Sequence, residues 1–170
     1  GTSVAGDPVG ARRKLAYIPE MVSLYPRFSG VENLDYFSRL GGRAHTQAEL
    51  LALLAQAGLP REAAERRVGT YSKGMRQKVG IALALATGAK ALLLDEPTSG
   101  LDPAASHEFS RMLRKLAADG VAILMATHDL FRAREDASRI GILVGGKLIA
   151  QYSRADLEDQ DLERLYLERL

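Results

Sequence analysis

A chain of 170 residues with 46% hydrophobic and 26% charged residues has the composition of a globular domain rather than of a disordered segment. It contains no cysteine, which excludes a disulfide scaffold, a thiolate zinc site and a cysteine nucleophile. The net charge of +2 is too small to indicate nucleic acid or an anionic membrane as a partner. No apolar run reaches the ~20 residues of a membrane span, and residues 1–10 lack a signal peptide's apolar stretch.

The charges are nevertheless uneven along the chain. Residues 61–90 carry seven basic and two acidic side chains, whereas residues 151–170 carry three basic and six acidic ones. Either both segments are ordinary solvated faces, or the basic segment faces an anion and the acidic tail is a charged surface helix.

Three helices are expected before residue 90. The first has apolar residues at helical spacing and stops at a pair of glycines; these residues are Val31, Leu34, Phe37 and Leu40. The second opens on the capping-box pair Thr46 and Glu49 and ends at Gly58. The third begins after Ser72 as its N-cap and runs to Gly88.

Short apolar segments alternate with these helices and predict strands. Leu15–Ile18 is expected to be a strand that Pro19 ends. The continuous apolar runs Ala91–Leu94 and Val121–Ala126 are typical of strands buried on both faces, and Ile140–Val144 is expected to be a third buried strand. A glycine pair then predicts a hairpin turn into Leu148–Ala150.

Two further helices complete the pattern. Asp102 and Pro103 form a strong helix start, and Gly120 ends that helix. Ser153 is expected to cap the last helix, whose apolar positions are Leu162, Leu165 and Tyr166. Strands alternating with helices in this order predict an α/β domain with a largely parallel sheet.

Polar clusters follow two of the predicted strands, where ligands bind in open α/β sheets. Asp95 and Glu96 suit a metal-bound phosphate ligand, because one carboxylate can hold Mg²⁺ and the other can orient an attacking water. The alternative is a plain strand-to-turn junction. His128 follows the strand Val121–Ala126, so it is expected to face the same crevice as Glu96, although a lone histidine is more often structural.

Two more clusters stand at helix starts. Residues 99–103 (SGLDP) alone are most simply a turn with a helix cap. Residues 71–77 (YSKGMRQ) place a serine, a lysine and a glycine at a helix N-terminus, where unpaired N–H groups suit an anion. A capped surface helix with solvated basic residues is the simpler alternative for that segment.

Taken in order, YSKGMRQ, LLLDEPTSGLDP and a strand ending in THD resemble the ATP-binding-cassette (ABC) ATPases, from about Tyr17 to Leu170. The branch that the sequence is most similar to is that of bacterial exporter ATPase subunits. The resemblance implies an incomplete P-loop NTPase (RecA-like) core with a mostly parallel sheet and an α-helical subdomain. It implies four segments: 1–29, core remnant and Q-loop; 30–74, helical subdomain ending in the signature motif; 75–150, core; 151–170, C-terminal helix.

The resemblance also implies roles for the residues at the strand ends. Asp95 would help to hold Mg²⁺, through water, and Glu96 would polarise the attacking water as general base. His128 would contact the γ-phosphate. Glu20 would belong to the Q-loop, which couples the site to the membrane subunit, and its carboxylate is a second candidate metal ligand. Glu20 stands where the broader family has Gln, so its charge would bind Mg²⁺ more strongly and also repel the triphosphate.

Two motifs are implied to act across a dimer of ATPase subunits. The signature residues Ser72, Lys73 and Gly74 would cap the γ-phosphate of ATP held by the partner subunit. Lys73 replaces a glycine and adds a cation near that phosphate, and Met75 replaces a glutamine. The D-loop, which would cross the dimer interface and sense the opposite site, consists of Ser99, Gly100, Leu101 and Asp102.

The printed sequence lacks G-x-x-x-x-G-K-[ST], the phosphate-cradling P-loop motif. Residues 1–9 resemble the loop after the strand that follows the P-loop helix. The P-loop strand would lie between Val121–Ala126 and Ile140–Val144, so another chain, a swapped oligomer or a shifted sheet is expected to fill that gap. Losing about four charge-assisted hydrogen bonds would cost roughly 6–12 kcal/mol, so these residues alone are expected neither to bind nor to hydrolyse ATP.

The leading hypothesis is therefore the ATPase subunit of an ABC membrane exporter, present as a fragment. It would require Mg²⁺ and ATP, a second ATPase subunit and a membrane-embedded permease, on the cytoplasmic face of the membrane. The alternative is a catalytically inactive partner that donates Ser72 and Gly74 to a complete subunit's ATP. A soluble ABC ATPase acting on ribosomes or DNA is a third hypothesis, but it would usually bring a second cassette or a long coiled coil, and no nucleic acid partner is expected.

Overall fold

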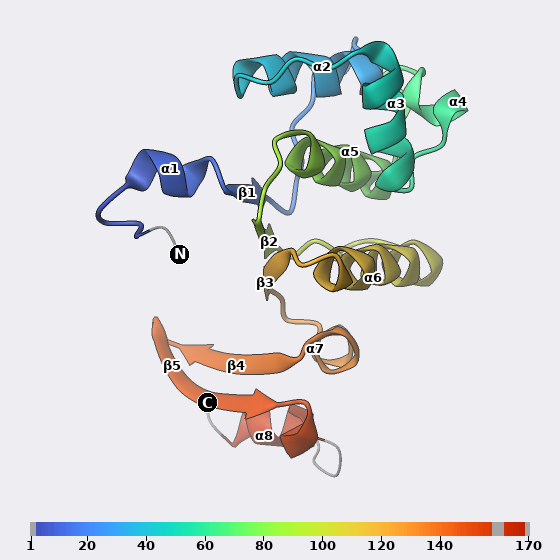
Figure 1. Cartoon of the computed structure of the whole chain (residues 1–170). Helices are drawn as coiled ribbons and strands as arrows, with labels where there is room; N and C mark the ends of the chain where they lie inside the picture. Colours follow the sequence, from blue (N-terminus) through green and yellow to red (C-terminus); the bar gives the residue numbers. More distant parts are fainter. Residues whose placement is uncertain (1–2, 158–161, 169–170) are drawn as a thin grey trace. The chain divides into compact units, whose positions relative to one another are not determined.

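The structure is a computed structural model that describes residues 3–157 and 162–168, and the chain divides into two compact units, Gly1–Ala126 and Thr127–Leu170 (Figure 1). The elements of the first unit are α1 (Pro8–Arg12), β1 (Leu15–Ile18), α2 (Gly30–Leu40), α3 (Gln47–Gln56), α4 (Arg61–Ala64), the 3-10 turn η1 (Val68–Thr70), α5 (Lys73–Ala86), β2 (Ala91–Asp95), α6 (Pro103–Ala118) and β3 (Ala122–Ala126). Those of the second unit are α7 (Leu130–Asp136), β4 (Arg139–Val144), β5 (Lys147–Ser153), the 3-10 turn η2 (Ala155–Leu157) and α8 (Leu162–Leu167).

The first unit is built on a parallel three-stranded sheet in the order β1-β2-β3, which confirms the predicted α/β class. The register pairs Tyr17 of β1 with Leu93 of β2, and Leu93 with Leu124 of β3. Side chains alternate between the two faces of a strand, so these three residues stand in one row on the same face. The carboxyl ends of β2 and β3 consequently lie side by side.

The two faces of this sheet differ in burial. Ile18, Leu92 and Leu94 are buried against α5 and α6, which lie side by side along that face (Figure 1). On the opposite face Tyr17 is 60% and Leu124 is 68% exposed. The prediction that 121–126 is buried on both faces is therefore wrong, because the helices of the first unit cover one face of β3. Likewise, Ala91 and Leu93 of β2 are half-buried rather than buried.

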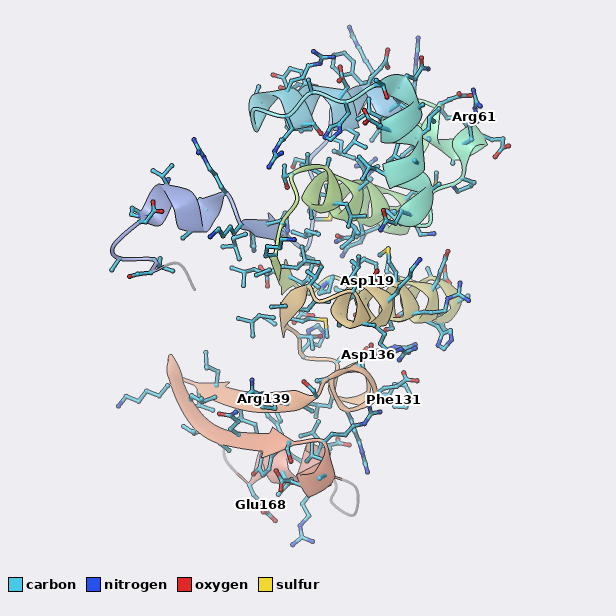
Figure 2. All side chains as sticks on the ribbon, viewed as in Figure 1. Arg61, Asp119, Phe131, Asp136, Arg139 and Glu168 are labelled. Carbon is cyan, nitrogen blue, oxygen red and sulfur yellow. The ribbon has the colours of Figure 1, made fainter. Side chains whose placement is uncertain are left out.

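Helices α2 and α3 pack on α5, and α4 packs on α2 and α3 (Figure 1). Their apolar sides form a core around Leu34, Leu54 and Leu59. The predicted helix starts are confirmed, since the side chains of Thr46, Ser72 and Asp102 all accept a backbone N–H at the N-terminus of their helices. Charged residues such as Arg61 project from the outer surface (Figure 2), where Arg61 pairs with Glu65 at 3.0 Å.

The second unit contains the predicted hairpin, since β4 and β5 are antiparallel and both residues of the intervening pair, Gly145 and Gly146, have positive φ. The prediction of a third buried strand is wrong, because Ile142 alone is buried in β4, a strand of a two-stranded sheet. The predicted cap of the last helix is also wrong. Ser153 ends β5, and its hydroxyl donates to Asp156 of η2 at 2.6 Å.

The first residues also differ from expectation, because Asp7 caps a short helix, α1, where a loop was predicted through residue 9. Within the described part of the chain, β3 pairs with β2, and β4 pairs with β5. Among the described residues, one edge of β3 therefore has no paired strand. What occupies that edge stays a prediction, as do the four segments expected from the sequence.

Candidate functional site

The first group of candidate residues stands at the end of β2. Asp95 is its last residue and is exposed, and its Oδ2 accepts a hydrogen bond from the hydroxyl of Tyr17 at 3.2 Å. That hydrogen bond, followed by burial and the charge of Asp95, raises the pKa of Tyr17. Tyr17 was not singled out from the sequence. The strand register brings the two residues together. Tyr17 pairs with Leu93, which lies two residues before Asp95 on the same face of β2.

Glu96 has a φ of +43°, the left-handed conformation that residues with a β-carbon rarely adopt. Among the described residues it is the one non-glycine residue with positive φ. Its amide donates to the carbonyl of Ala126 at 2.9 Å, which ties the end of β2 to the end of β3. Strained residues of this kind cost roughly 1–3 kcal/mol and cluster at functional sites. The sharp turn directs the chain away from the sheet immediately after Asp95.

The predicted D-loop continues directly from this turn. Ser99 donates its amide to the carbonyl of Glu96 at 3.2 Å, and Gly100 has a φ of +66°. Asp102 then caps α6 through the amide of Ala105 at 2.9 Å. The acidic pair and the D-loop are therefore one continuous connection between β2 and α6.

The predicted signature residues lie against this connection. Ser72 is the exposed N-cap of α5, and its hydroxyl accepts the amide of Met75 at 3.3 Å. A β-carbon added to Gly74 would lie 3.5 Å from Leu101 Cδ2 and 3.9 Å from the β-carbon of Ala105. The start of α5 thus packs on the D-loop and the first turn of α6, and the structure brings these two motifs together within the first unit.

Glu20 follows β1, and its Oε1 accepts a hydrogen bond from Nζ of Lys73 at 3.0 Å. Gln77, which is fully buried, holds the backbone of the same segment, because its Nε2 donates to the carbonyls of Glu20 at 2.9 Å and Pro19 at 3.3 Å. No signal in the sequence indicated this amide contact, since a glutamine inside a helix is ordinarily solvated.

The residues present fit a magnesium ion of the kind that binds with nucleotide. Mg²⁺ takes one or two protein carboxylates and completes its octahedral shell with water and phosphate oxygens. Asp95 offers an exposed carboxylate at a strand end. Across the residues that the structure describes, no three His, Cys, Asp or Glu side chains gather into a metal site, so a protein-only cage is not formed. The role of Glu20 as a metal ligand stays a prediction.

His128 belongs to the second unit, where it is exposed and directly precedes the N-cap of α7, Asp129. Asp129 accepts the amide of Arg132 at 3.0 Å and donates its own amide to the hydroxyl of Thr127 at 3.0 Å. These bonds fix the backbone on either side of His128. Its predicted convergence with Glu96 relates two units and stays a prediction.

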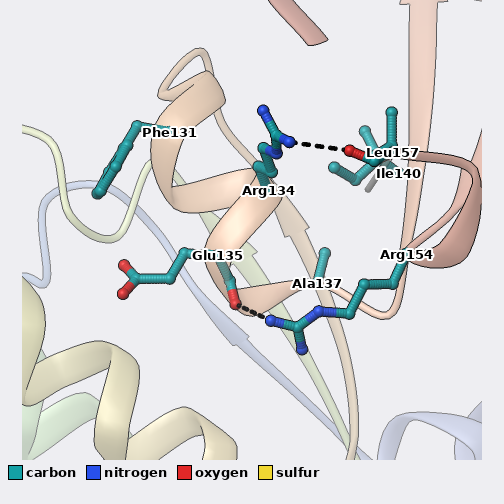
Figure 3. A pocket seen from close by; sticks show the side chains of 7 residues that line it. All are labelled: Phe131, Arg134, Glu135, Ala137, Ile140, Arg154 and Leu157. Carbon is teal, nitrogen blue, oxygen red and sulfur yellow. Dashed lines mark hydrogen bonds between the residues drawn. The ribbon is translucent and has the colours of Figure 1, made fainter. Parts of the chain in front are cut away.

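A cavity of about 440 Å³ lies within the second unit, between α7, β4 and η2 (Figure 3). Its two arginines serve the fold, since Arg134 donates to the carbonyl of Leu157 at 2.9 Å and Arg154 to that of Glu135 at 3.2 Å. These hydrogen bonds join α7 to the segment after β5. The cavity contains none of the residues that the sequence singled out.

A second surface feature was missed by the sequence analysis. An aromatic cluster forms from the segment before α2 and from α2 itself, with ring centroids 5.1–6.3 Å apart. Its members are Tyr25, Phe28, Tyr36 and Phe37. Beside it lies a groove of about 530 Å³ lined by Phe28, Glu32, Asp35, Tyr36, Arg39 and Leu40. The signal in the sequence is four aromatic residues within thirteen positions.

Comparison with known proteins places these features in context. The family model described as "ABC transporter" matches residues 5–99. An uncharacterized ABC transporter ATP-binding protein of Synechocystis is 33% identical over 94% of this chain and 47% of its own length. The Nod factor export ATP-binding protein I of Burkholderia orbicola is 36% identical over 88% of this chain and 51% of its own length.

A mammalian relative and two solved structures agree with these matches. ATP-binding cassette sub-family A member 7 of Rattus norvegicus is 34% identical over 86% of this chain and 7% of its own length. A structure of an ATP binding subunit of an ABC transporter has a TM-score of 0.79 and 32% identity, covering 99% of this chain and 73% of that one. A dimeric, post-hydrolysis ATP-binding cassette bound to ADP and Pi has a TM-score of 0.74 and 28% identity, covering 87% and 67%.

The chain thus spans about half the length of the two bacterial relatives and a small part of the mammalian one. Within the described ranges, none of the helices is at once long enough and apolar enough to cross a bilayer.

Proposed function

Because the chain belongs to the ABC transporter family, we propose that it is part of an ATP-binding subunit that drives a membrane exporter from the cytoplasmic face of the membrane. We propose that the whole protein hydrolyses ATP and requires Mg²⁺ for this. It would act as a dimer with a second ATPase subunit, bound to a membrane-embedded permease. The small net charge of +2 argues against a nucleic acid partner.

One observation carries this proposal: the acidic strand end, the D-loop and the signature helix form one connected surface in the first unit. The strained Glu96 continues through Ser99 into the D-loop, and Gly74 at the start of α5 packs on Leu101 of that loop. A contact of this kind lets a phosphate bound against one motif be sensed at the other. An isolated strand-end turn would not need a helix N-terminus beside it.

Each residue then has a chemical task. A bound Mg²⁺ would neutralise charge on the phosphate oxygens. Asp95 would hold the Mg²⁺, and Glu96 is the general base that accepts a proton from the attacking water. His128 contacts the γ-phosphate. Ser72, Lys73 and Gly74 bind the γ-phosphate of ATP held by the partner subunit, because a capped helix N-terminus directs N–H groups and a partial positive charge at an anion.

The aromatic cluster is the surface that we assign to the membrane-embedded subunit. The loop that carries it is fixed on two sides. Buried Asn33 accepts the amide of Tyr25 at 2.8 Å and donates to its carbonyl at 3.1 Å, while Phe28 accepts the amide of Val68 at 2.8 Å. A rigid apolar groove with charged edges suits an amphipathic helix of a partner. The loop begins a few residues after Glu20, so a partner docked here can influence that residue.

The second candidate function is that of an inactive partner which completes another subunit's site. It is favoured by the contact between Gly74 and Leu101, which brings the start of the signature helix and the D-loop together within the first unit. On either function, we propose that these 170 residues by themselves neither bind ATP at cellular concentrations nor hydrolyse it. Calorimetric titration with Mg-ATP tests this, and micromolar binding by the chain alone would contradict it.

The ATPase assignment is tested on the natural full-length protein with its membrane partner. Glu96→Gln is expected to reduce ATP hydrolysis about 10²- to 10⁴-fold, because the general base is lost. Glu62→Gln, an equal change of charge at an exposed residue of α4, should leave hydrolysis unchanged. Equal rates in the Glu96 variant and the parent protein would contradict the assignment.

The two candidate functions are separated by mixing. The chain is combined with a subunit that has an intact P-loop, and ATP hydrolysis is measured. If the chain donates its signature motif, Ser72→Arg abolishes the hydrolysis that mixing produces. If mixing produces no hydrolysis, the inactive-partner function is excluded.

A further inference from the structure

An ion pair joins the signature helix to the segment after β1 within one subunit. Lys73, the first residue of α5, places Nζ 3.0 Å from Oε1 of Glu20. The side chain of Lys73 is 23% exposed and that of Glu20 is 49% exposed. Both groups are therefore accessible to a ligand that approaches the start of α5.

The backbone beneath this pair is held rigidly. Gln77, one turn further along α5, donates its amide to the carbonyls of Pro19 and Glu20. A β-carbon added to Gly80 would lie 3.4 Å from both Ile18 and Val22, so α5 and this segment already approach closely. Since the backbones are fixed, the ion pair is the part of the contact that can change without unpacking the core.

Lys73 also stands beside the D-loop. A β-carbon added to Gly100 would lie 3.9 Å from its Nζ. The ammonium group therefore lies between the carboxylate of Glu20 and the loop that follows Glu96. A phosphate that reached the N-terminus of α5 would meet Lys73 while it is paired with Glu20.

We infer that Glu20 is an internal competitor of the nucleotide: Lys73 exchanges this carboxylate for the γ-phosphate of ATP bound by the partner subunit. The inference rests on the proposed function and adds a regulatory step to the same site. A phosphate carries more negative charge than a carboxylate and accepts stronger charge-assisted hydrogen bonds, and the helix N-terminus favours it further. Exchange releases Glu20, and loss of the phosphate restores the pair.

The exchange couples two surfaces of the subunit. While Glu20 holds Lys73, the segment after β1 is bound to the signature helix by a side-chain contact as well as by Gln77. When the partner's nucleotide takes Lys73, one of these two contacts is broken. The segment that leads to Tyr25 and the aromatic cluster is then less restrained. Binding of the partner subunit's ATP by Lys73 therefore affects the surface that we assign to the membrane-embedded subunit.

The test measures ATP-driven association of the full-length subunit in which Glu96→Gln blocks hydrolysis, by light scattering against ATP concentration. Glu20→Gln removes the competitor and is expected to lower the half-maximal ATP concentration by up to about fivefold, the range of a partly exposed ion pair. Lys73→Gln is expected to raise it. In the Lys73→Gln background, Glu20→Gln should have no further effect, because Glu20 acts through Lys73.

Glu108→Gln is the matched control, since Glu108 of α6 pairs at 2.8 Å with Lys78, which lies on α5 as Lys73 does. It should leave association unchanged. An effect of Glu20→Gln that persists fully without Lys73 overturns the exchange, as does no effect at all. If the parent protein shows no ATP-driven association, the proposed function itself fails, and the exchange fails with it.

A second experiment reverses the charges of the ion pair. The reversed pair, Glu20→Lys with Lys73→Glu, should unfold in urea at nearly the same concentration as the parent, while each single reversal unfolds earlier. ATP should nevertheless fail to drive association of subunits with the reversed pair, because residue 73 then presents a carboxylate to the phosphate. ATP-driven association of the reversed pair at the parent's ATP concentration overturns the inference.

Discussion

The hydroxyl of Tyr17 donates to Oδ2 of Asp95 at 3.2 Å, across neighbouring strands of the parallel sheet. This contact orients the carboxylate at the point where β2 ends. It comes from the exposed face of the sheet, where Tyr17 shares a row with Leu124.

Tyr17→Phe is expected to raise the Mg²⁺ concentration for half-maximal ATP hydrolysis by about tenfold, because groups that orient a metal-binding carboxylate are commonly worth 10- to 100-fold. The measurement is a Mg²⁺ titration of ATP hydrolysis by the full-length protein. Tyr152→Phe, which removes a hydroxyl from β5 in the second unit, is the control. An unchanged Mg²⁺ dependence would show that Asp95 is oriented without Tyr17.

The backbone of Glu96 supplies a second prediction. Its φ of +43° is unfavourable for a residue with a β-carbon but not for glycine. Glu96→Gly is therefore expected to increase the free energy of unfolding by about 1 kcal/mol while it abolishes hydrolysis. Glu96→Ala keeps the β-carbon and should not stabilise the protein. Equal unfolding midpoints in urea for the two variants would mean that no strain is stored here.

Gly30 at the start of α2 cannot accept a side chain without a shift of its neighbours. A β-carbon there would lie 2.5 Å from the hydroxyl of Tyr71 and 3.1 Å from the carbonyl of Ala64. Gly30→Ala should lower the free energy of unfolding by about 1–3 kcal/mol, the usual cost of overpacking. Gly41→Ala is the control, since its nearest atoms would be at 3.4–3.6 Å and its φ is −76°. Equal losses in both variants would contradict this reading of the contacts.

Asn33 is fully buried and satisfies three backbone groups, the amide and carbonyl of Tyr25 and the carbonyl of Ser29. Asn33→Ala leaves these groups without that partner and should cost about 1–3 kcal/mol in urea unfolding. It should also reduce co-purification with the membrane-embedded subunit, because the aromatic loop loses its anchor. Arg61→Gln, which breaks an exposed pair, should change neither quantity appreciably. Undiminished co-purification would show that the loop does not take part in binding the membrane-embedded subunit.

The capping box of α3 predicts a pH dependence. Hydrogen bonds to Glu49 from the amide of Thr46 at 2.7 Å and its hydroxyl at 2.9 Å hold the pKa of Glu49 below its usual range. A lowered pKa adds stability above the ordinary glutamate pKa, and that stability is lost as the pH falls through the lowered value. Glu49→Gln should therefore lose less stability than the parent between pH 6 and about pH 3. Glu62→Gln is the control, and identical pH profiles for parent and Glu49→Gln would contradict the prediction.

Local sequence signals predicted the elements and their caps well. Thr46, Ser72 and Asp102 cap helices as expected, because a cap involves a side chain and an amide only two or three residues away. Ser153 was assigned to the wrong element, because its hydroxyl accepts the amide of Asp156 at 3.4 Å and so caps the 3-10 turn η2 instead of the last helix.

Burial was predicted less well than element type. A run of apolar residues indicates a strand, but exposure depends on which layers cover it, and Leu124 is 68% exposed on the open face of the sheet. For the motifs, too, the sequence located the residues but not their tertiary contacts. Asp95, Glu96 and the D-loop were located by their order along the chain, whereas the partners Tyr17 and Gln77 were not, since each comes from a distant segment.

The sequence alone therefore determined the α/β class, the ends of most helices and the family resemblance, and it supplied the candidate site residues. Each of these depends on neighbours along the chain or on a contiguous motif. Only the tertiary structure decided that Lys73 pairs with Glu20, that Glu96 is held in a left-handed conformation and that Gly74 lies on the D-loop. These depend on how β1, β2, α5 and α6 pack, and residues 53 positions apart meet only when the core that carries them has formed.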